Sequence, residues 1–153
     1  MRVYTVAGIA GLAAGAVLAA RRGLLVIEVV GDSMDPTYHS GDRLLVRRSR
    51  RVRRGHVVIA HHQEGGRREE PGAAYVTTWL VKRLVALPGD PVPDAVKPAV
   101  GGNGHLVPAG MTVLLGDHPG SADSRSWGFI PLSDVAGIVV ARLRPRPLRP
   151  GLA

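Results

Sequence analysis

Two residues of this chain could form a nucleophile and its base, Ser33 and Lys82. Ser33 stands in GDSMDPTYHSGD (31–42), directly after an apolar, β-branched run that predicts a strand over residues 24–30. A strand fixes the backbone in front of a nucleophile, and the loop after it exposes the hydroxyl. The same residue types also form ordinary turns, so this segment alone leaves catalysis open.

Lys82 is placed better than any histidine to be the base. In WLVKRLVAL (79–87) the side-chain alternation puts Lys82 on the same largely apolar strand face as Leu80 and Leu84. Burial disfavours the ammonium, and a pKa shift from about 10.4 to about 7–8 corresponds to roughly 4 kcal/mol. A neutral Lys82 amine could then deprotonate Ser33. The alternative is a lysine that carries its charge to the rim of the sheet.

A lysine base needs a neighbour that orients its amine. The segment GDHPGSADSRSWG (116–128) offers Ser121 and Ser124 for this role. Of the twenty Lys and Arg residues only Lys82 and Lys97 are lysines. Lysine can lose its proton inside a protein and arginine in practice cannot, so these two positions are the ones to inspect for a base.

An uncharged segment near the N-terminus has the length of a membrane helix. Residues 3–20 carry no charge, and as a helix they would span about 27 Å, close to a bilayer core of about 30 Å. We therefore expect a membrane anchor over residues 1–23, with a cleaved signal peptide or a buried helix as alternatives. More arginines follow the segment than precede it, which favours a cytoplasmic C-terminal domain.

The rest of the chain predicts strands separated by Gly, Pro and Asp. The expected strands are 24–30, 42–48, 56–60, 75–87 (one bent strand or a pair), 111–117 and 135–143. After the expected anchor, no segment shows a convincing helical period over ten residues. The chain therefore predicts an all-β domain over 24–143, as a small barrel or folded sheet, and a disordered Pro/Arg-rich tail over 144–153.

The formal net charge of +8 favours anionic partners. The densest basic run, residues 47–56, predicts first a solvated hairpin loop, then a contact with anionic lipid headgroups. No nucleic-acid partner is expected, because aromatic residues make up only 4% of the chain and no nucleic-acid motif accompanies the run. The chain has no cysteine, and His56, His61 and His62 lack convergent carboxylates, so no metal is expected.

Four segments, in order, resemble the type I signal peptidases, membrane-anchored serine endopeptidases with a Ser/Lys dyad. GDSMDPT (31–37) resembles their nucleophile block, and SGDRLLV (40–46) resembles the block after it. VKRLVALPGD (81–90) resembles the base block, and LLGDHPGSADSRSWGFIP (114–131) resembles the last one. The resemblance covers roughly residues 24–143.

The resemblance implies that Ser33 is the nucleophile, Lys82 the general base and Ser121 the residue that orients the lysine. It implies an all-β catalytic core behind one transmembrane helix at the cell membrane, with the catalytic domain outside the cytoplasm. It also implies a preprotein or propeptide substrate, bound as an extended strand and cut after Ala-x-Ala through an acyl-enzyme, and no cofactor. The supporting positions of the family blocks are Gly31, Met34, Pro36, Arg83, Asp117, Asp123 and Arg125.

Three departures from the family pattern stand out. Gly31 replaces a serine whose hydroxyl helps the oxyanion hole in many members, so the Ser33 N–H would do more of that work. The last block is one residue shorter before Ser121, with His118 in place of an asparagine. Too few residues separate Lys82 from Gly116 for the inserted β-domain of the larger bacterial enzymes.

Three other functions fit parts of the pattern. Maturation peptidases of the nickel superoxide dismutase type share these blocks and work in the cytoplasm, the side that the charges favour. An SOS-repressor-type autoprotease also uses a Ser/Lys dyad, but an apolar segment stands where its upstream DNA-binding domain should be. The third possibility is a catalytically inactive membrane protein. The presence of both Ser33 and Lys82 argues against it.

Overall fold

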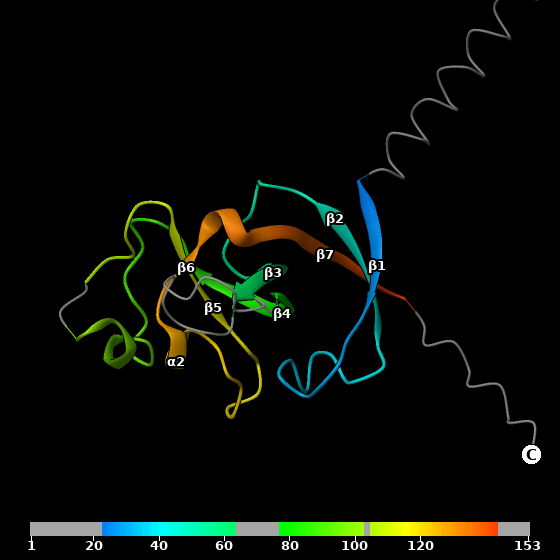
Figure 1. The fold of residues 1–153 in the computed structure, drawn as a ribbon, viewed down its shortest axis with the longest axis horizontal. Helices are drawn as coiled ribbons and strands as arrows, with labels where there is room; N and C mark the ends of the chain where they lie inside the picture. Colours follow the sequence, from blue (N-terminus) through cyan, green and yellow to red (C-terminus); the bar gives the residue numbers. More distant parts are fainter. Residues whose placement is uncertain (1–22, 64–76, 103–104, 144–153) are drawn as a thin grey trace, which may run out of the picture.

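The computed structural model describes residues 23–63, 77–102 and 105–143, which fold around a curled antiparallel sheet (Figure 1). Within these residues the sheet has seven strands in the order β1-β2-β7-β3-β4-β5-β6. The strands are β1 (Leu24–Glu28), β2 (Arg43–Arg48), β3 (Val57–Gln63), β4 (Thr77–Ala86), β5 (Met111–Leu115), β6 (Ile130–Pro131) and β7 (Val135–Leu143). The expected β domain is thus confirmed as a mostly β fold.

Three short helical turns connect the later strands. They are η1 (Lys97–Val100), α2 (Ser124–Trp127) and η2 (Leu132–Asp134). Among the described parts of the chain, no helix is long and apolar enough to cross a membrane. The expected anchor, apart from Gly23, and the expected tail lie outside the described residues.

Strand β7 lies between β2 and β3, although the chain passes through both strands before it reaches β7. Val139 pairs with Val46 of β2, and Gly137 pairs with Ile59 of β3. The backbones are close here, because a Cβ atom on Gly137 would lie 2.8 Å from the Arg47 carbonyl oxygen. The last strand of the sheet therefore joins its two halves.

This topology corrects the prediction for segment 47–56. Strands β2 and β3 do not pair with each other, because β7 lies between them, so the connection between them is not a hairpin loop. The arginines of the segment are solvated as expected. Those that are exposed are Arg47, Arg48, Arg50, Arg51, Arg53 and Arg54.

The core lies on one face of strands β3, β4, β5 and β7. Its main cluster consists of Val58, Ala60, Leu84, Leu114, Ile130, Val135 and Ile138. Burial of an aliphatic side chain of this size stabilises the fold by roughly 1.5–3 kcal/mol. A second cluster of small aliphatic side chains, which includes Val96 and Val113, packs the region between β4 and β5.

The long segment predicted as a bent strand or a pair forms the single strand β4. Its residues 77–83 pair with the whole of β3, from Gln63↔Thr77 to Val57↔Arg83. Its pairing with β5 begins only at Arg83. The first half of β4 and the outer edge of β1 are therefore sheet edges that no described strand covers.

Candidate active site

Lys82 lies on the core face of β4, and its side chain is only 3% exposed. Its Nζ atom donates a hydrogen bond to Ser121 Oγ at 2.6 Å. Burial lowers the pKa of Lys82; the Asp123 carboxylate works against this shift, and Arg125 adds to it. The predicted apolar strand face is thus confirmed, and the amine meets a hydroxyl there.

Ser121 and Ser124 were both candidates to orient the lysine, and the structure separates them. Ser121 Oγ is the partner of Lys82. Ser124 is fully buried, and its Oγ accepts a hydrogen bond from the Leu114 N–H at 3.0 Å. Ser124 therefore supports strand β5 rather than the lysine.

Asp123 holds the loop that carries Ser121. The carboxylate is fully buried; it accepts a hydrogen bond from the Gly116 N–H at 2.7 Å and two from the Arg125 guanidinium. Burial by itself raises the pKa of Asp123, but the hydrogen bonds from Arg125 and Gly116 outweigh it and hold the pKa below the usual value. Asp123 also caps the N-terminus of α2. The loop is thereby fixed at both ends.

Gly116 brings the backbone of Ser33 close to the side chain of Ser121. A Cβ atom on Gly116 would lie 2.2 Å from Ser121 Oγ and 2.4 Å from the Ser33 carbonyl oxygen. That carbonyl oxygen also accepts a hydrogen bond from the His118 N–H at 3.2 Å. The Ser33 backbone therefore lies close to the side chain of Ser121, which in turn contacts Lys82.

A second network connects the Ser33 loop to the same strands. The Arg83 guanidinium binds the Asp117 carboxylate through Nε at 2.8 Å and Nη2 at 2.6 Å. The Thr37 hydroxyl donates to the same carboxylate. The hydrogen bonds from Arg83 hold the pKa of Asp117 below its usual value. Arg83 follows Lys82 and Asp117 follows Gly116 in the chain. The network therefore helps to fix the positions of Lys82 and Gly116.

The sequence predicted no role for Thr37, whose hydroxyl binds Asp117 in the structure. It stands in the nucleophile segment, and no charge or spacing there indicates that it binds Asp117. In the same loop Met34 is fully buried and fixes the chain just after Ser33. Gly31 has a positive φ of 85° and donates its N–H to Ser40 Oγ, while Pro36 is exposed. No described contact links Gly31 or Pro36 to Lys82.

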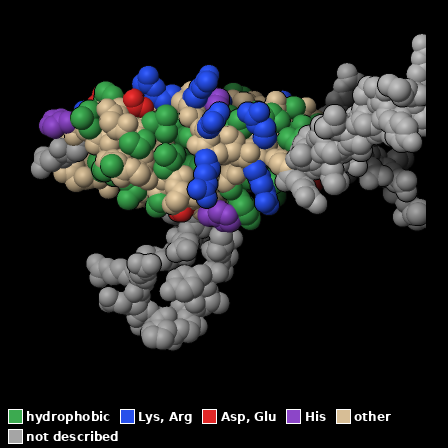
Figure 2. Space-filling view, turned by 90° about the horizontal axis from the view of Figure 1, so that it is seen from above, with side chains coloured by type: hydrophobic (Ala, Val, Ile, Leu, Met, Phe, Trp, Pro, Cys, Tyr) green, Lys and Arg blue, Asp and Glu red, His purple; other side chains and the backbone are tan. Residues whose placement is uncertain are grey.

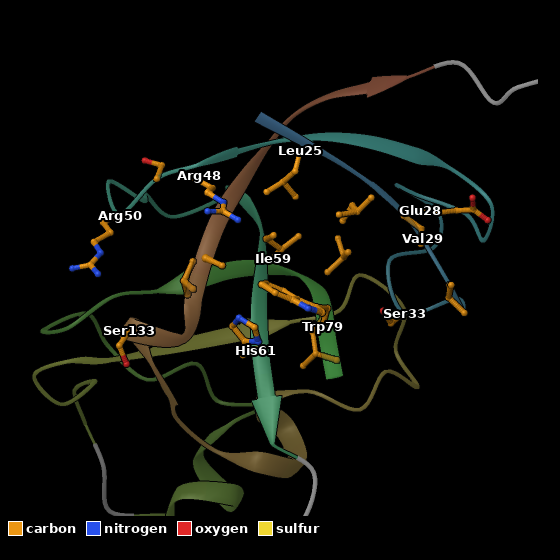
Figure 3. A pocket seen from close by; sticks show the side chains of 17 residues that line it. Leu25, Glu28, Val29, Ser33, Arg48, Arg50, Ile59, His61, Trp79 and Ser133 are labelled. Carbon is orange, nitrogen blue, oxygen red and sulfur yellow. The ribbon is translucent and has the colours of Figure 1, made fainter. Parts of the chain in front are cut away.

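A cleft of about 1240 Å³ runs from Ser33 along the sheet (Figure 3). One wall comes from β1 and the segment that follows it, and the other wall comes from β3 and β4. About half of the lining residues are aliphatic, among them Leu25, Ile27, Val29, Ile59, Val81 and Val135. Between the walls the Trp79 ring is 56% exposed and packs on His61, with ring centroids 3.6 Å apart. Ser33 therefore lies at one end of an elongated apolar groove.

Figure 2 shows Lys and Arg side chains gathered over the middle of one face of the molecule. The Arg48 N–H donates to the Gly23 carbonyl, so the chain enters the sheet beside the arginine-rich segment 47–54. Among the described residues, no group of three or more His, Asp or Glu side chains could hold a metal ion.

The comparisons with known proteins agree with this arrangement. The family model described as "Signal peptidase, peptidase S26" matches residues 2–97 and 92–144. The chain is 27% identical to signal peptidase I of Leptolyngbya laminosa, over 76% of this chain and 67% of that protein. It is 30% identical to mitochondrial inner membrane protease subunit 1 of Schizosaccharomyces pombe, over 76% of this chain and 71% of that protein. The chain therefore belongs to the signal peptidase family, peptidase S26, and is a serine endopeptidase.

Proposed function

We propose that this endopeptidase removes N-terminal signal peptides from exported preproteins, with Ser33 as nucleophile and Lys82 as general base. The observation that carries the proposal is the buried Lys82 amine, hydrogen-bonded to Ser121 beside the backbone of Ser33. A base must be neutral to accept a proton, and burial shifts Lys82 in that direction. Ser121 is then a positioning residue that acts through the amine.

In the acylation step, Ser33 Oγ attacks the scissile carbonyl carbon and its proton passes to Lys82 Nζ. The resulting ammonium returns the proton to the nitrogen of the leaving peptide as the C–N bond breaks. Water then attacks the acyl-enzyme, with Lys82 taking and returning a proton in the same way. The Ser33 N–H donates to no acceptor among the described residues, so it is available for the oxyanion.

The substrate would bind as an extended strand along the groove that begins at Ser33. The outer edge of β1 and the first half of β4 are uncovered by described strands, so their backbone groups can pair with a peptide. We expect small side chains next to the scissile bond, of the Ala-x-Ala kind. No metal or cofactor is required in these steps.

The enzyme would be held at the membrane by residues 1–23. The segment 3–20 has the length and hydropathy for a span, and the exposed arginines of segment 47–54 follow close to where this segment ends. Such a surface attracts anionic lipid headgroups. In an export peptidase the catalytic domain would lie outside the cytoplasm.

A cytoplasmic maturation peptidase with one client protein is the second candidate. The observation in its favour is the excess of arginines after the N-terminal segment, which by the positive-inside rule retains the domain in the cytoplasm. C-terminal reporter fusions separate the two candidates. A reporter active only outside the cytoplasm supports export processing, and the reverse result supports maturation.

The dyad is tested by Ser33→Ala and Lys82→Ala in the full chain, assayed in detergent on a preprotein with an Ala-x-Ala site. We expect each variant to lose at least about a thousandfold in kcat/KM. Ser126→Ala and Lys97→Ala are matched controls, because both residues are away from the site, and we expect them to cut at the parent rate. If both dyad variants cut as fast as the parent, the assignment is wrong.

A further inference from the structure

The groove that begins at Ser33 has a basic end. In Figure 3, Arg48, Arg50 and Ser133 lie at the end of the groove away from Ser33, with Ile59, His61 and Trp79 between them. Arg48 ends strand β2, and Arg50 follows it in the connection to β3. The groove thus changes from an aliphatic character near the proposed nucleophile to a cationic character at its far end.

Neither arginine is neutralised within the described residues. Ion pairs there involve other arginines, such as Arg54 with Asp90 and Arg142 with Asp42, but none involves Arg48 or Arg50. Both side chains are exposed and line the groove. Glu28 is the acidic residue of the lining, and it lies beside Val29 toward the opposite end (Figure 3). The far end therefore presents two uncompensated guanidinium groups.

An extended peptide bound at Ser33 would reach these groups. Lining residues between Leu25 and Ser33 form one wall of the groove, with strand β1 ending at Glu28 and a turn at Ser33. A fully extended chain of about nine residues spans roughly 26 Å at about 3.3 Å per residue, which is the upper limit for the length of this wall. The His61 and Trp79 rings, packed on each other, form the floor between the two ends. A substrate residue roughly six to eight positions from the scissile bond would then face Arg48 and Arg50.

We propose that the basic end of the groove is a recognition subsite for an acidic side chain of the substrate. Arginine matches a carboxylate with two parallel hydrogen bonds, and it keeps its charge at any working pH. Ser133 is neutral, and its hydroxyl donates a hydrogen bond to Asp134 at 3.2 Å. The inference rests on the proposed function. It narrows the substrate to a preprotein or propeptide with Asp or Glu at this distance from the cut.

The test uses the full chain in neutral detergent and a set of peptides with one Ala-x-Ala site. In each peptide a single Asp occupies one position from four to ten residues from the scissile bond, on either side, and its matched peptide has Asn there. We expect one or two adjacent positions on one side at which Asp raises kcat/KM about five- to tenfold over Asn. This preference should shrink as sodium chloride is raised from 20 to about 500 mM, since exposed charges are screened.

Two double variants decide whether the subsite is responsible. Arg48→Gln with Arg50→Gln should abolish the Asp-over-Asn ratio. Arg51→Gln with Arg53→Gln removes the same charge from residues that do not line the groove, and it should keep the ratio. A preference that survives in the first variant, or no preference at any position in peptides that are cut, overturns the proposal.

A binding measurement on an inactive variant tests the subsite independently of catalysis. Fluorescence anisotropy of the labelled Asp and Asn peptides is measured on Ser33→Ala, with and without the two groove substitutions. Tighter binding of the Asp peptide, lost with Arg48 and Arg50, supports the subsite even if the cleavage chemistry is assigned wrongly. Equal binding of both peptides overturns the subsite. If the groove variant changes only the response to added phosphatidylglycerol, the arginines contact lipid headgroups and the proposal is wrong.

Discussion

The Nζ atom of Lys82 lies 2.6 Å from Ser121 Oγ, and the lysine side chain is almost completely buried. The two residues come from β4 and from the loop after β5. Burial favours the neutral amine, and the hydroxyl fixes where the amine points. This pair gives the candidate site a base whose amine is held in one orientation. Four predictions test this pair and the residues that support it.

Ser121→Ala should lower kcat/KM about 10- to 100-fold, because the Lys82 amine loses the hydroxyl that orients it. The measurement is the pH–rate profile: the acid limb, which reports the essential base, should shift in the variant. Ser126→Ala, in the exposed part of α2, is the matched control and should keep both rate and profile. A Ser121→Ala enzyme with the parent profile would show that the hydrogen bond has no role in catalysis.

Lys82→Met should abolish activity and remove one component of the pH dependence of stability. The lowered pKa of Lys82 means that the unfolded chain binds more protons than the folded protein between that pKa and 10.5. Stability of the parent should therefore rise with pH across this window, and the rise should be smaller in the variant. Thermal unfolding of both proteins from pH 6 to 10.5 measures the difference. Parallel pH curves would show that burial does not perturb this amine.

Asp123→Asn should destabilise the fold by about 2–3 kcal/mol, because it breaks a buried charge-assisted network and leaves Arg125 without its carboxylate. The folded-state pKa of Asp123 is lowered, so its contribution is fully present above about pH 3.8 and is lost as pH falls through the lowered value. Urea unfolding at pH 7 and at pH 3 checks both points. The control Asp94→Asn, at an exposed carboxylate, should change nothing measurable.

Gly116→Ala should reduce activity strongly and cost about 1–3 kcal/mol of stability, because the new Cβ atom would overlap Ser121 Oγ and the Ser33 carbonyl. Both groups must shift apart, which separates the proposed nucleophile from the oriented base. Kinetics on a peptide substrate and thermal unfolding together measure the effect. In the control Gly120→Ala the nearest atoms are 3.3 Å away in the His118 ring, and its activity should remain. Equal activities of the two variants would contradict the close approach.

Much of the sheet could be predicted from the sequence, because side-chain alternation directly reports which residues face a core. The segments predicted at 42–48, 111–117 and 135–143 contain β2, β5 and β7. The two-residue strand β6 was not predicted, since two residues carry no periodicity. The hairpin predicted for 47–56 is wrong, because loop composition reports exposure and does not report which strand becomes the neighbour.

The sequence by itself determined the chemistry available to this protein: one serine after a strand, one lysine on an apolar face, and segments in the order of a known family. The residue pattern alone left Ser121 and Ser124 open, and only the family resemblance favoured Ser121. The pattern also could not assign Thr37 to Asp117, because those contacts depend on how distant loops pack. Only the tertiary structure decided them, through the close approach at Gly116 and the network at Asp123. Local patterns set which side chains are buried, whereas long-range packing sets which of the buried groups meet.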